Sequence, residues 1–257
     1  MNKNIYITAS IVLFNEDLKE LENTVSCFLN VKISKKLYLI DNTLNGDFKG
    51  LFHHQDIEYI AVPSNIGFGA GHNKALKYLK DKSDYHLILN PDVSFKPKII
   101  TTLISQLELD NSTAMIAPKV LFPDGRHQYS CRRYPTVSEL LARRFTFLKF
   151  IFKKQILKGT YRDLDLNQSF FADYITGCFH LYRTEDFVKL NGFDERYFLY
   201  MEDVDICKKI DLMGKKKLYY PQEEIIHVLK QGSSKSFKLF LRHTFSAIKY
   251  FLKWGFR

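Results

Sequence analysis

The sequence predicts an α/β fold in which a largely parallel central sheet is flanked by helices. Two observations lead to this expectation: short apolar runs rich in β-branched residues, typical of strands, and stretches with apolar residues at helical spacing. The two kinds of segment alternate along the first ninety residues. Strands that alternate with helices imply crossover connections between parallel neighbours. The chain of 257 residues is long enough to bury a sizeable core.

The expected elements follow one another along the whole chain. Strands are expected at Ile5–Phe14, Leu37–Ile40, Ile57–Val62, His86–Leu89, Met115–Phe122, Tyr174–Tyr182 and Lys217–Tyr220. Helices are expected at Glu16–Leu29, His72–Lys80, Ile99–Leu107, Asp186–Leu190 and Val204–Met213. No internal repeat or low-complexity linker interrupts them. The body is therefore expected to form one compact unit with a C-terminal extension.

Charge is distributed unevenly along the chain. Lys and Arg outnumber Asp and Glu by 38 to 28, which gives a formal net charge of +10. Residues 140–162 and 225–257 contain no acid and together carry +14, so the remainder carries −4. A mildly acidic body with two basic segments argues against a nucleic-acid binder. The balance favours other anionic partners, such as a nucleotide or an acidic lipid surface.

Polar clusters follow three of the first four predicted strands. They are Asn15-Glu16, Asp41-Asn42 and Asn90-Pro91-Asp92. Each cluster alone is explicable as a turn, because Asn, Asp and Pro are turn-forming residues. In parallel sheets, however, ligands bind beyond the carboxyl ends of the strands. Three clusters at one edge of a sheet therefore favour a ligand site.

The third cluster suits a hard divalent cation, which takes oxygen ligands and shares them with phosphates. Asp92 would supply a carboxylate, and Asn90 a neutral oxygen for the metal or for a sugar hydroxyl. His227 would be a further metal contact if the chain folds back over Asp92. A capped turn and a structural histidine explain the same residues without a metal.

A glycine-rich loop, Asn65–Asn73, follows the third predicted strand. Alternate glycines ahead of a helix let the backbone approach a phosphate closely, and a helix N-terminus favours an anion. The spacing is G-x-G-x-G after the third strand, and not the G-x-G-x-x-G that follows the first strand in dinucleotide-binding loops. A purely structural loop is the alternative.

The segment Gly192–Asp205 combines acidic and aromatic side chains. Five acids lie within twelve residues, interleaved with Phe and Tyr. Carboxylates walled by aromatic rings are partly desolvated, which suits a general base. Asp203 and Asp205 also fall in the first turn of the predicted Val204–Met213 helix, where capping is the structural alternative.

The C-terminal segment from Ser236 onward predicts an amphipathic helix. Its basic residues Lys238, Arg242, Lys249 and Lys253 gather on one side, and its aromatic and aliphatic residues on the other. A basic, aromatic-rich helix without acids is typical of an interfacial membrane anchor, here on an anionic membrane surface. The alternative is a helix whose apolar face packs on the body.

Taken in order, these motifs resemble the family 2 glycosyltransferases, and most closely the bacterial rhamnosyltransferase-like branch. The resemblance extends from about Ile5 to Ser234 and depends above all on Gly192–Asp205. It implies a GT-A fold, with residues 1–234 as one domain and 235–257 as the C-terminal helix. Within that domain it implies a Rossmann-like nucleotide-sugar half, 1–110, and an acceptor half, 111–234.

The resemblance also implies roles for individual residues. Asp41 would read a pyrimidine base, and the remaining nucleotide contacts would come from Phe14, Asn15, Asn65, Gly69, Asn73 and Asn90. Asp92 and His227 would hold Mg²⁺ or Mn²⁺ on the diphosphate. Asp203 would deprotonate the acceptor hydroxyl, with substrate contacts from Asp173, Gly177 and Glu202. Arg132 or Arg133 would neutralise charge on the leaving diphosphate.

The expected activity is an inverting, metal-dependent transfer from a nucleotide-sugar to a glycan hydroxyl. The branch favours dTDP-rhamnose as donor, with a UDP-hexose as the alternative. A polyprenyl-diphosphate-linked acceptor would explain both basic segments and implies a cytoplasmic protein, peripheral at the inner face of the plasma membrane. A different class of function, a non-catalytic protein that binds a membrane or an acidic polymer, has no need of polar residues at strand ends.

Overall fold

The structure is a computed structural model that describes residues 4–44, 48–80, 82–144, 150–229 and 237–256. The strands of the N-terminal half are β1 (Tyr6–Leu13), β2 (Ser34–Asp41), β3 (Ile57–Ala61), β4 (Tyr85–Leu89) and β5 (Val93–Ser94). Those of the C-terminal half are β6 (Thr113–Leu121), β7 (Cys131–Arg132), β8 (Phe170–Phe171), β9 (Tyr174–Ile175), β10 (Phe179–Arg183) and β11 (Lys216–His227). The helices are α1 (Leu18–Leu29), α2 (Phe68–Asn73), α3 (Leu76–Leu79), α4 (Lys98–Glu108), α5 (Val137–Arg144), α7 (Lys153–Gly159), α8 (Thr184–Lys189), α9 (Glu202–Leu212) and α11 (Phe237–Trp254).

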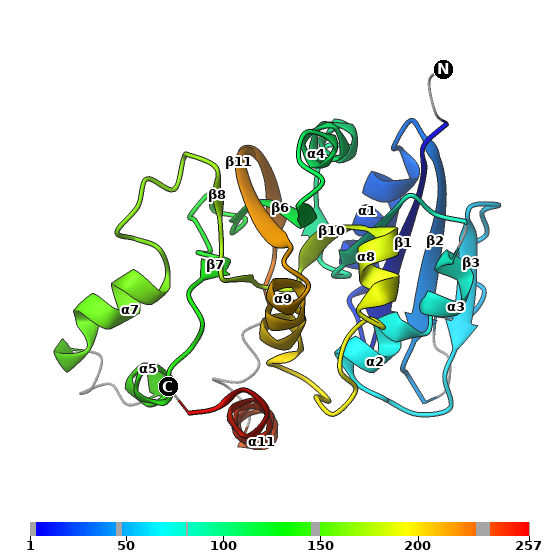
Figure 1. Ribbon diagram of the computed structural model, residues 1–257. Coiled ribbons are helices and arrows are strands. Elements are labelled where there is room, and N and C mark those ends of the chain that lie inside the picture. The colour runs from blue at the N-terminus through cyan, green and yellow to red at the C-terminus, as the bar shows by residue number, and fades with distance from the viewer. Residues whose placement is uncertain (1–3, 45–47, 81, 145–149, 230–236, 257) are drawn as a thin grey trace.

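The central sheet is mixed, with the strand order β3-β2-β1-β4-β10-β6-β11-β5 (Figure 1). The first four strands of this order are parallel to one another, as the sequence predicts. Strand β10 then lies antiparallel between β4 and β6, and β6 is parallel to β11. The N-terminal half therefore has the carboxyl-edge geometry at which α/β proteins bind ligands.

Each face of the sheet is buried beneath helices, which explains why its strands read as continuous apolar runs. Successive side chains of a strand point to opposite faces. Leu37 and Leu39 of β2 pack in the core beneath α1 and α4, whereas Tyr38 and Ile40 pack in a second core with residues of α3, α8 and α9.

Three of the predicted elements differ most in extent or continuity, and the short elements β5, β7, β8, α5 and α7 were not predicted. The helix expected at His72–Lys80 begins earlier and is divided into α2 and α3. The strand expected at Tyr174–Tyr182 is divided into β9 and β10 at Gly177. The strand expected at Lys217–Tyr220 continues to His227, with a register shift between Tyr220 and Glu224 that accommodates Pro221.

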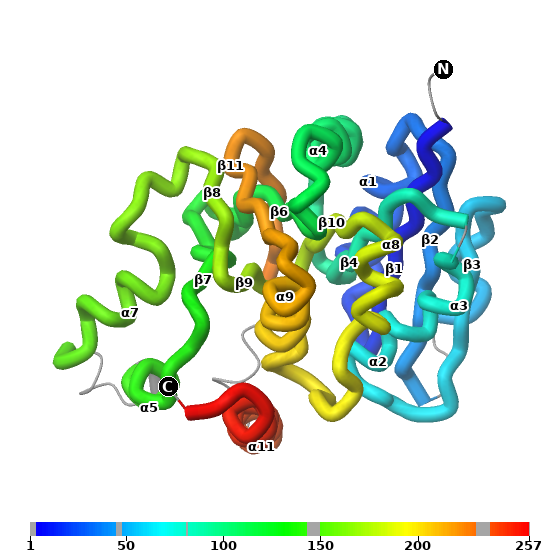
Figure 2. The backbone as a smooth tube through the Cα atoms, viewed as in Figure 1, coloured from blue at the N-terminus to red at the C-terminus, as the bar shows by residue number. Residues whose placement is uncertain are grey.

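Helix α11 lies against the body, beneath α9 and next to α5 (Figure 2). The boundary expected between residues 234 and 235 falls outside the described residues. Within the described part of the chain, no helix is both long and apolar enough to span a bilayer.

Candidate active site

The polar clusters that end β1 and β2 lie side by side. Leu13 pairs with Asp41, and the Asn42 N–H donates to the Leu13 carbonyl at 2.9 Å. Phe14 is 46% exposed and Asn15 is exposed as well. The structure thus brings together three of the residues predicted to contact the nucleotide, with an aromatic side chain open to solvent among them.

Asp41 is fully buried and its carboxylate is fixed by two donors. It accepts the Thr43 N–H at 2.8 Å and the Tyr59 hydroxyl at 2.5 Å. The neighbouring Asn42 donates from Nδ2 to the Gly67 carbonyl at 3.0 Å, while its Oδ1 is buried with no hydrogen-bond partner among the described residues. Asn42 was not predicted as a site residue, although it belongs to the polar cluster that singled out Asp41.

Close packing within the protein explains why the Asn65–Asn73 loop needs glycines. A Cβ on Gly67 would overlap the carbonyl oxygen of Phe198, and one on Gly69 would lie 2.8 Å from the Phe193 Cβ. The Asn65 Oδ1 accepts the Gly67 N–H at 2.9 Å. These contacts support the structural alternative for the loop, and the nucleotide contacts of Asn65 and Gly69 remain predictions.

Gly67→Ala is expected to destabilise the protein more than Gly125→Ala does. Both glycines have positive φ, 95° and 80°, but a Cβ on Gly125 meets nothing within 4 Å. Gly125→Ala carries only the left-handed backbone cost, about 1 kcal/mol, whereas Gly67→Ala must also displace Phe198, so about 2 kcal/mol or more is expected. Urea unfolding of the two variants measures the difference, and equal losses would contradict the packing role.

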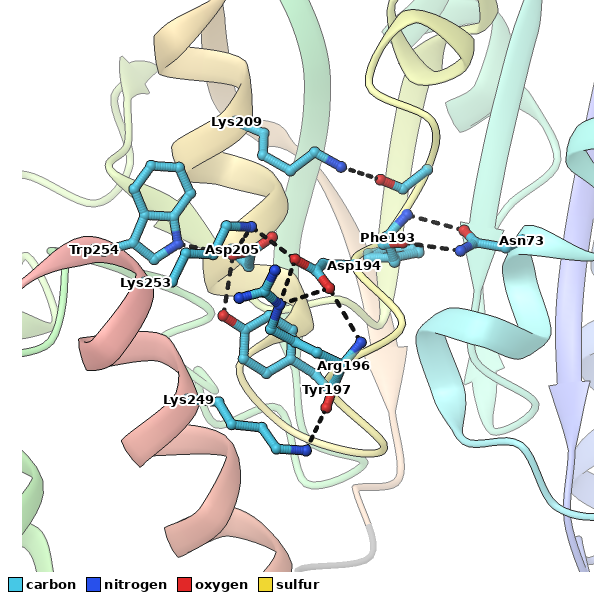
Figure 3. Close-up of polar contacts among 11 residues, drawn as sticks. Asn73, Phe193, Asp194, Arg196, Tyr197, Asp205, Lys209, Lys249, Lys253 and Trp254 are labelled. Carbon is cyan, nitrogen blue, oxygen red and sulfur yellow. Dashed lines mark hydrogen bonds and ion pairs between the residues drawn. The ribbon is translucent and has the colours of Figure 1, made fainter.

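Asn73 joins the glycine loop to the acidic segment (Figure 3). Its Nδ2 donates to the Phe193 carbonyl and its Oδ1 accepts the Phe193 N–H, both at 2.9 Å. Its Nδ2 also lies 3.0 Å from a Glu195 carboxylate oxygen. Asn73 therefore has a structural role that its position in the sequence did not reveal, and its nucleotide contact remains a prediction.

The residues predicted to hold a metal ion meet at the ends of β4 and β11. His227 pairs with Val93, and its Nε2 lies 3.3 Å from the Asp92 Oδ1 and 3.3 Å from the Asn90 Nδ2. Gln128 Oε1 lies 3.0 Å from the His227 Nδ1, so that the Nδ1–H can donate to it. Such a contact orients an imidazole so that its other nitrogen faces a ligand.

This donor set fits a divalent cation. The Asn90 Oδ1 is buried and accepts no hydrogen bond from a described residue, while the buried Asp92 Oδ1 has the His227 Nε2 as its neighbour at 3.3 Å. Two oxygens and one imidazole nitrogen suit Mg²⁺ or Mn²⁺ when phosphates and water supply the remaining ligands. Among the described residues, no group of three or more His, Cys, Asp and Glu side chains forms a complete metal cage.

Helix α9 begins with Glu202, predicted to contact the substrate, and Asp203, predicted to be the catalytic base. Tyr200 and Met201, just before the helix, both have left-handed backbones, with φ of 70° and 69°. Left-handed non-glycine residues cost about 1–3 kcal/mol each and cluster at functional sites. Glu202 is buried and Asp203 is partly buried. Gly177, at the break between β9 and β10, would place a Cβ only 3.5 Å from that of Asp203.

Burial raises the pKa of both carboxyl groups, but their surroundings differ. For Asp203, the N–H groups of Val204 and Gly177 and the charge of Arg132 oppose the effect of burial. For Glu202, the charge of Asp203 adds to the effect of burial and holds the pKa well above its ordinary value. When the surroundings of two neighbouring acids give them different pKa values, one can act as a base while the other stays protonated.

The residues predicted to contact the substrate form two groups: Arg132 and Glu202 line one cavity, and Asp173 and Gly177 do not. Arg132 lines the same cavity as Glu202 and Asp203. Arg133 instead forms a two-pronged ion pair with Asp163, at 2.7 and 2.9 Å, so Arg132 is the arginine that the site can use. Asp173 accepts the Tyr134 N–H at 3.0 Å and does not line that cavity. Its contact with the substrate remains a prediction.

The cavity has a volume of about 700 Å³ and lies between the start of α9 and the helices α5 and α11. A larger hollow, about 980 Å³, lies at the amino ends of the strands, where Asn4 and Ser34 line it, and contains none of the predicted site residues. The chemistry expected from the sequence therefore belongs to the smaller cavity and to the strand ends.

Helix α11 docks on the body through a buried carboxylate (Figure 3). The Asp205 Oδ1 accepts the Lys253 ammonium at 2.7 Å, the Trp254 Nε1–H at 2.7 Å and the Tyr197 hydroxyl at 3.1 Å. Lys253 also binds Asp194 at 2.8 Å. The helix packs on the body, but not through its apolar face alone as the alternative expected: the basic Lys253 binds Asp205, and the apolar Phe251 is buried.

The face of α11 that points away from the body is largely apolar, although Lys238 and Lys249 are exposed as well. Phe237 is 74% exposed, Phe245 60% and Leu252 71%. We call these three residues the outer stripe. Of the two basic segments, Lys149 of the first and Lys230, Lys235 and Arg257 of the second lie outside the described residues.

Comparison with known proteins agrees with the motifs and the fold. No family model matches the chain. It is 34% identical to rhamnosyltransferase WbbL of Escherichia coli K12 over 206 residues, which is 75% of this chain and 74% of that protein. It is 26% identical to the N-acetylglucosaminyl-diphospho-decaprenol L-rhamnosyltransferase of Mycobacterium tuberculosis, over 68% of this chain and 59% of that protein. It is 24% identical to the low-salt glycan biosynthesis hexosyltransferase Agl10 of Haloferax volcanii, over 77% and 60%.

Among solved structures, the fold resembles that of GalNAc-T7 in complex with UDP, GalNAc and Mn²⁺. The TM-score is 0.65, with 14% identity, over 87% of this chain and 43% of that chain. This likeness confirms the GT-A fold. The strand-end clusters, the carboxylates that begin α9 and the identity to a rhamnosyltransferase over three quarters of the chain lead to one conclusion. The chain is a glycosyltransferase and belongs to the rhamnosyltransferase-like branch of family 2.

Proposed function

We propose that this glycosyltransferase moves rhamnose from dTDP-rhamnose to a hydroxyl of a polyprenyl-diphosphate-linked glycan, with inversion at the anomeric carbon. The observation that carries the proposal is the pairing of two sites. Asp92 and His227 meet at the strand ends. Asp203, in the first turn of α9, lines a cavity that does not include those two residues. The names of two relatives, both rhamnosyltransferases and one acting on a decaprenol-linked sugar, support the donor and the acceptor.

A divalent cation, Mg²⁺ or Mn²⁺, would be held by Asp92, His227 and the amide oxygen of Asn90. When bound, it supplies charge neutralisation for the nucleoside diphosphate that leaves. Exposed Phe14 and buried Asp41 at the neighbouring strand ends would hold the nucleotide base.

The protein's own residues supply the proton transfer. Asp203 accepts the proton of the acceptor hydroxyl while that oxygen attacks the anomeric carbon of the donor sugar. The bond from that carbon to the diphosphate oxygen breaks, and the nucleoside diphosphate departs from the opposite side. A direct displacement of this kind needs one positioned base and no protein nucleophile.

A UDP-hexose is the second candidate donor. One relative is named a hexosyltransferase, and the structural neighbour was solved with UDP. Asp41 and Phe14 would contact uracil as well as thymine, since the two pyrimidines differ by one methyl group.

Thermal unfolding with dTDP, UDP and GDP, each with and without Mn²⁺, tests the donor and the metal. We expect dTDP to raise the midpoint only when Mn²⁺ is present, because a ligand of the folded state stabilises it by mass action. Asp92→Ala is expected to abolish the rise, which is measured against the variant's own unliganded midpoint because the change also removes the buried partner of His227. A rise with UDP alone would favour the hexose donor. No rise with any nucleotide, from a folded protein that converts no nucleotide-sugar, would overturn the proposal.

The outer stripe is proposed to place the enzyme at the inner face of the plasma membrane. Phe237, Phe245 and Leu252 are aromatic or aliphatic, exposed and on one helix, which suits insertion at the boundary between lipid headgroups and chains. Lys238, on the same helix, is exposed and would attract anionic lipid.

Phe245→Glu together with Leu252→Glu is expected to abolish binding to vesicles that contain phosphatidylglycerol. Two carboxylates would have to enter the interface, and burying charge there is costly. Sedimentation with vesicles at low salt measures binding, and turnover of a water-soluble acceptor is expected to stay within about twofold. Unchanged sedimentation of the double variant would exclude the outer stripe as the anchor.

A further inference from the structure

We propose that the cavity between α5 and α11 binds the apolar part of the acceptor, next to the base that activates its sugar hydroxyl. This inference depends on the proposed function, because it assigns a place in the protein to the lipid-linked acceptor. It makes α11 a substrate-binding element in addition to any role in membrane binding.

The cavity has one polar wall and one apolar wall. The polar wall comes from the body and includes Arg132, Glu202 and Asp203. The other wall, which we call the apolar wall, comes from the two helices. It is mostly apolar, with Leu140 of α5 and Ala247, Ile248 and Phe251 of α11, and it also contains Glu139, His243 and Thr244. A glycan alone would leave its hydroxyl groups without partners along the apolar wall, and unpaired buried polar groups are costly. A hydrocarbon chain gains free energy there for each methylene that it buries.

Arg132 adds a cation to this cavity. The hydrogen bond that its side chain makes within the described residues is a long one, from Nε to the Tyr129 carbonyl at 3.4 Å. Burial raises the pKa of Glu139 and of Asp203, which line the same cavity, and the charge of Arg132 opposes that rise. A guanidinium with unused donors matches a phosphate. The lining therefore combines a base for a sugar hydroxyl, a cation for a phosphate and apolar side chains for a hydrocarbon chain.

Neighbouring positions of one helix distinguish this function from membrane binding, because Ile248 borders the cavity and lies one turn from both Phe245 and Leu252. Ala247, Ile248 and Phe251 line the cavity, whereas Phe245 and Leu252 of the outer stripe do not. Ile248 and Leu252 are both aliphatic and exposed, at 47% and 71%. They form a matched pair for mutation, because the same substitution at either position leaves the buried core untouched.

The test measures binding of dodecyl phosphate, a phosphate with an apolar chain and no sugar, by calorimetry below its critical micelle concentration. Wild type and Leu252→Glu are expected to bind equally. Ile248→Glu, which adds a charge to the apolar wall, is expected to weaken binding about tenfold or more. Ala247→Trp, which fills the cavity, is expected to have the same effect, and thermal unfolding checks that each variant is folded.

Each outcome decides the proposal. If Leu252→Glu and Ile248→Glu weakened the binding of dodecyl phosphate equally, its hydrocarbon chain would lie on the outer stripe. If Ile248→Glu and Ala247→Trp left that binding unchanged, the cavity would be excluded as the binding site. Absence of binding to the wild type would also overturn the proposal. Because the measurement needs no donor and no turnover, its result is independent of the nucleotide experiment that tests the proposed function.

Discussion

Replacing Asp203 by Asn is expected to lower the rate of sugar transfer about a thousandfold while the protein stays folded. The amide has the size of the carboxylate but cannot accept the proton of the acceptor hydroxyl, and a positioned base contributes about 10²–10⁴ to a rate. Because the acceptor still fits the cavity, the loss is expected in kcat more than in KM. Release of the nucleoside diphosphate, measured with saturating donor and Mn²⁺, gives both constants.

The stability of the variant distinguishes lost chemistry from lost structure. The pKa of Asp203 is raised in the folded protein, chiefly by burial. A carboxyl group with a raised pKa favours folding at low pH and loses that contribution as pH rises through its folded pKa. Asn carries no charge at any pH, so at pH 7–8 Asp203→Asn is expected to be at least as stable as the wild type. A lower midpoint of unfolding would show that the carboxylate is needed for structure.

Glu202→Gln is the matched control, since Glu202 is the adjacent acid and lines the same cavity. The pKa of Glu202 is held well above its ordinary value, so the side chain is largely protonated near neutral pH and a poor base. Its replacement is expected to reduce kcat by less than about tenfold. If Glu202→Gln had the larger effect, the roles of the two acids would be exchanged.

The sequence predicts most of the sheet because strands that are buried on both faces consist of consecutive apolar residues. All five residues of β4 are buried, and so are the last five of β2. The polar clusters after these strands could be assigned to one edge from the parallel arrangement alone. The meeting of Asp92 with His227, 135 residues apart in the chain, required only that the last strand return beside β5.

Other features could not be predicted because their causes lie in distant contacts. Gly177 ends β9 at the point where the chain passes the Asp203 side chain, although Tyr174–Tyr182 has a uniform strand pattern. β11 continues past Pro221 because a register shift accommodates the missing N–H, whereas the proline in the sequence indicates an end. Buried His86, which bonds to Ser10 at 3.0 Å and to Thr8 at 2.8 Å, interrupts an apolar strand without any local signal.

Asp205 is the residue whose role the sequence leaves most open. Its place in the first turn of α9 predicts helix capping, yet its side chain is fully buried and binds the last turn of α11. Helix α11 has basic residues and no acids, and the rest of the body carries a net negative charge. The sequence therefore indicates that some carboxylate of the body could pair with the helix. Only the fold shows which one.

Asp205→Ala is expected to destabilise the protein by about 3 kcal/mol. The change removes the acceptor shared by Lys253, Trp254 and Tyr197. Removing one partner of a buried ion pair costs about 3–5 kcal/mol because it leaves the other groups desolvated and unpaired, and Lys253 retains Asp194 as a partial substitute. Urea unfolding at pH 7 measures the loss.

Asp194→Ala is the matched control for this carboxylate. It removes the other acceptor of Lys253, but its side chain is 18% exposed and lies nearer to solvent. An ion pair open to water contributes about 1 kcal/mol or less. A loss after Asp205→Ala no greater than after Asp194→Ala would show that the buried contact does not hold α11.

A double-mutant cycle with Lys253→Met assigns the effect of Asp205 to the helix. If the two residues act through each other, the double variant loses about 1–2 kcal/mol less than the sum of the single losses. The same variants are expected to lose affinity for dodecyl phosphate, because α11 forms the apolar wall of the cavity and its last turn is anchored by Asp205. Additive stability losses with unchanged binding would mean that the wall is held by other contacts, such as the Ser246 hydroxyl on the Leu199 carbonyl at 2.9 Å.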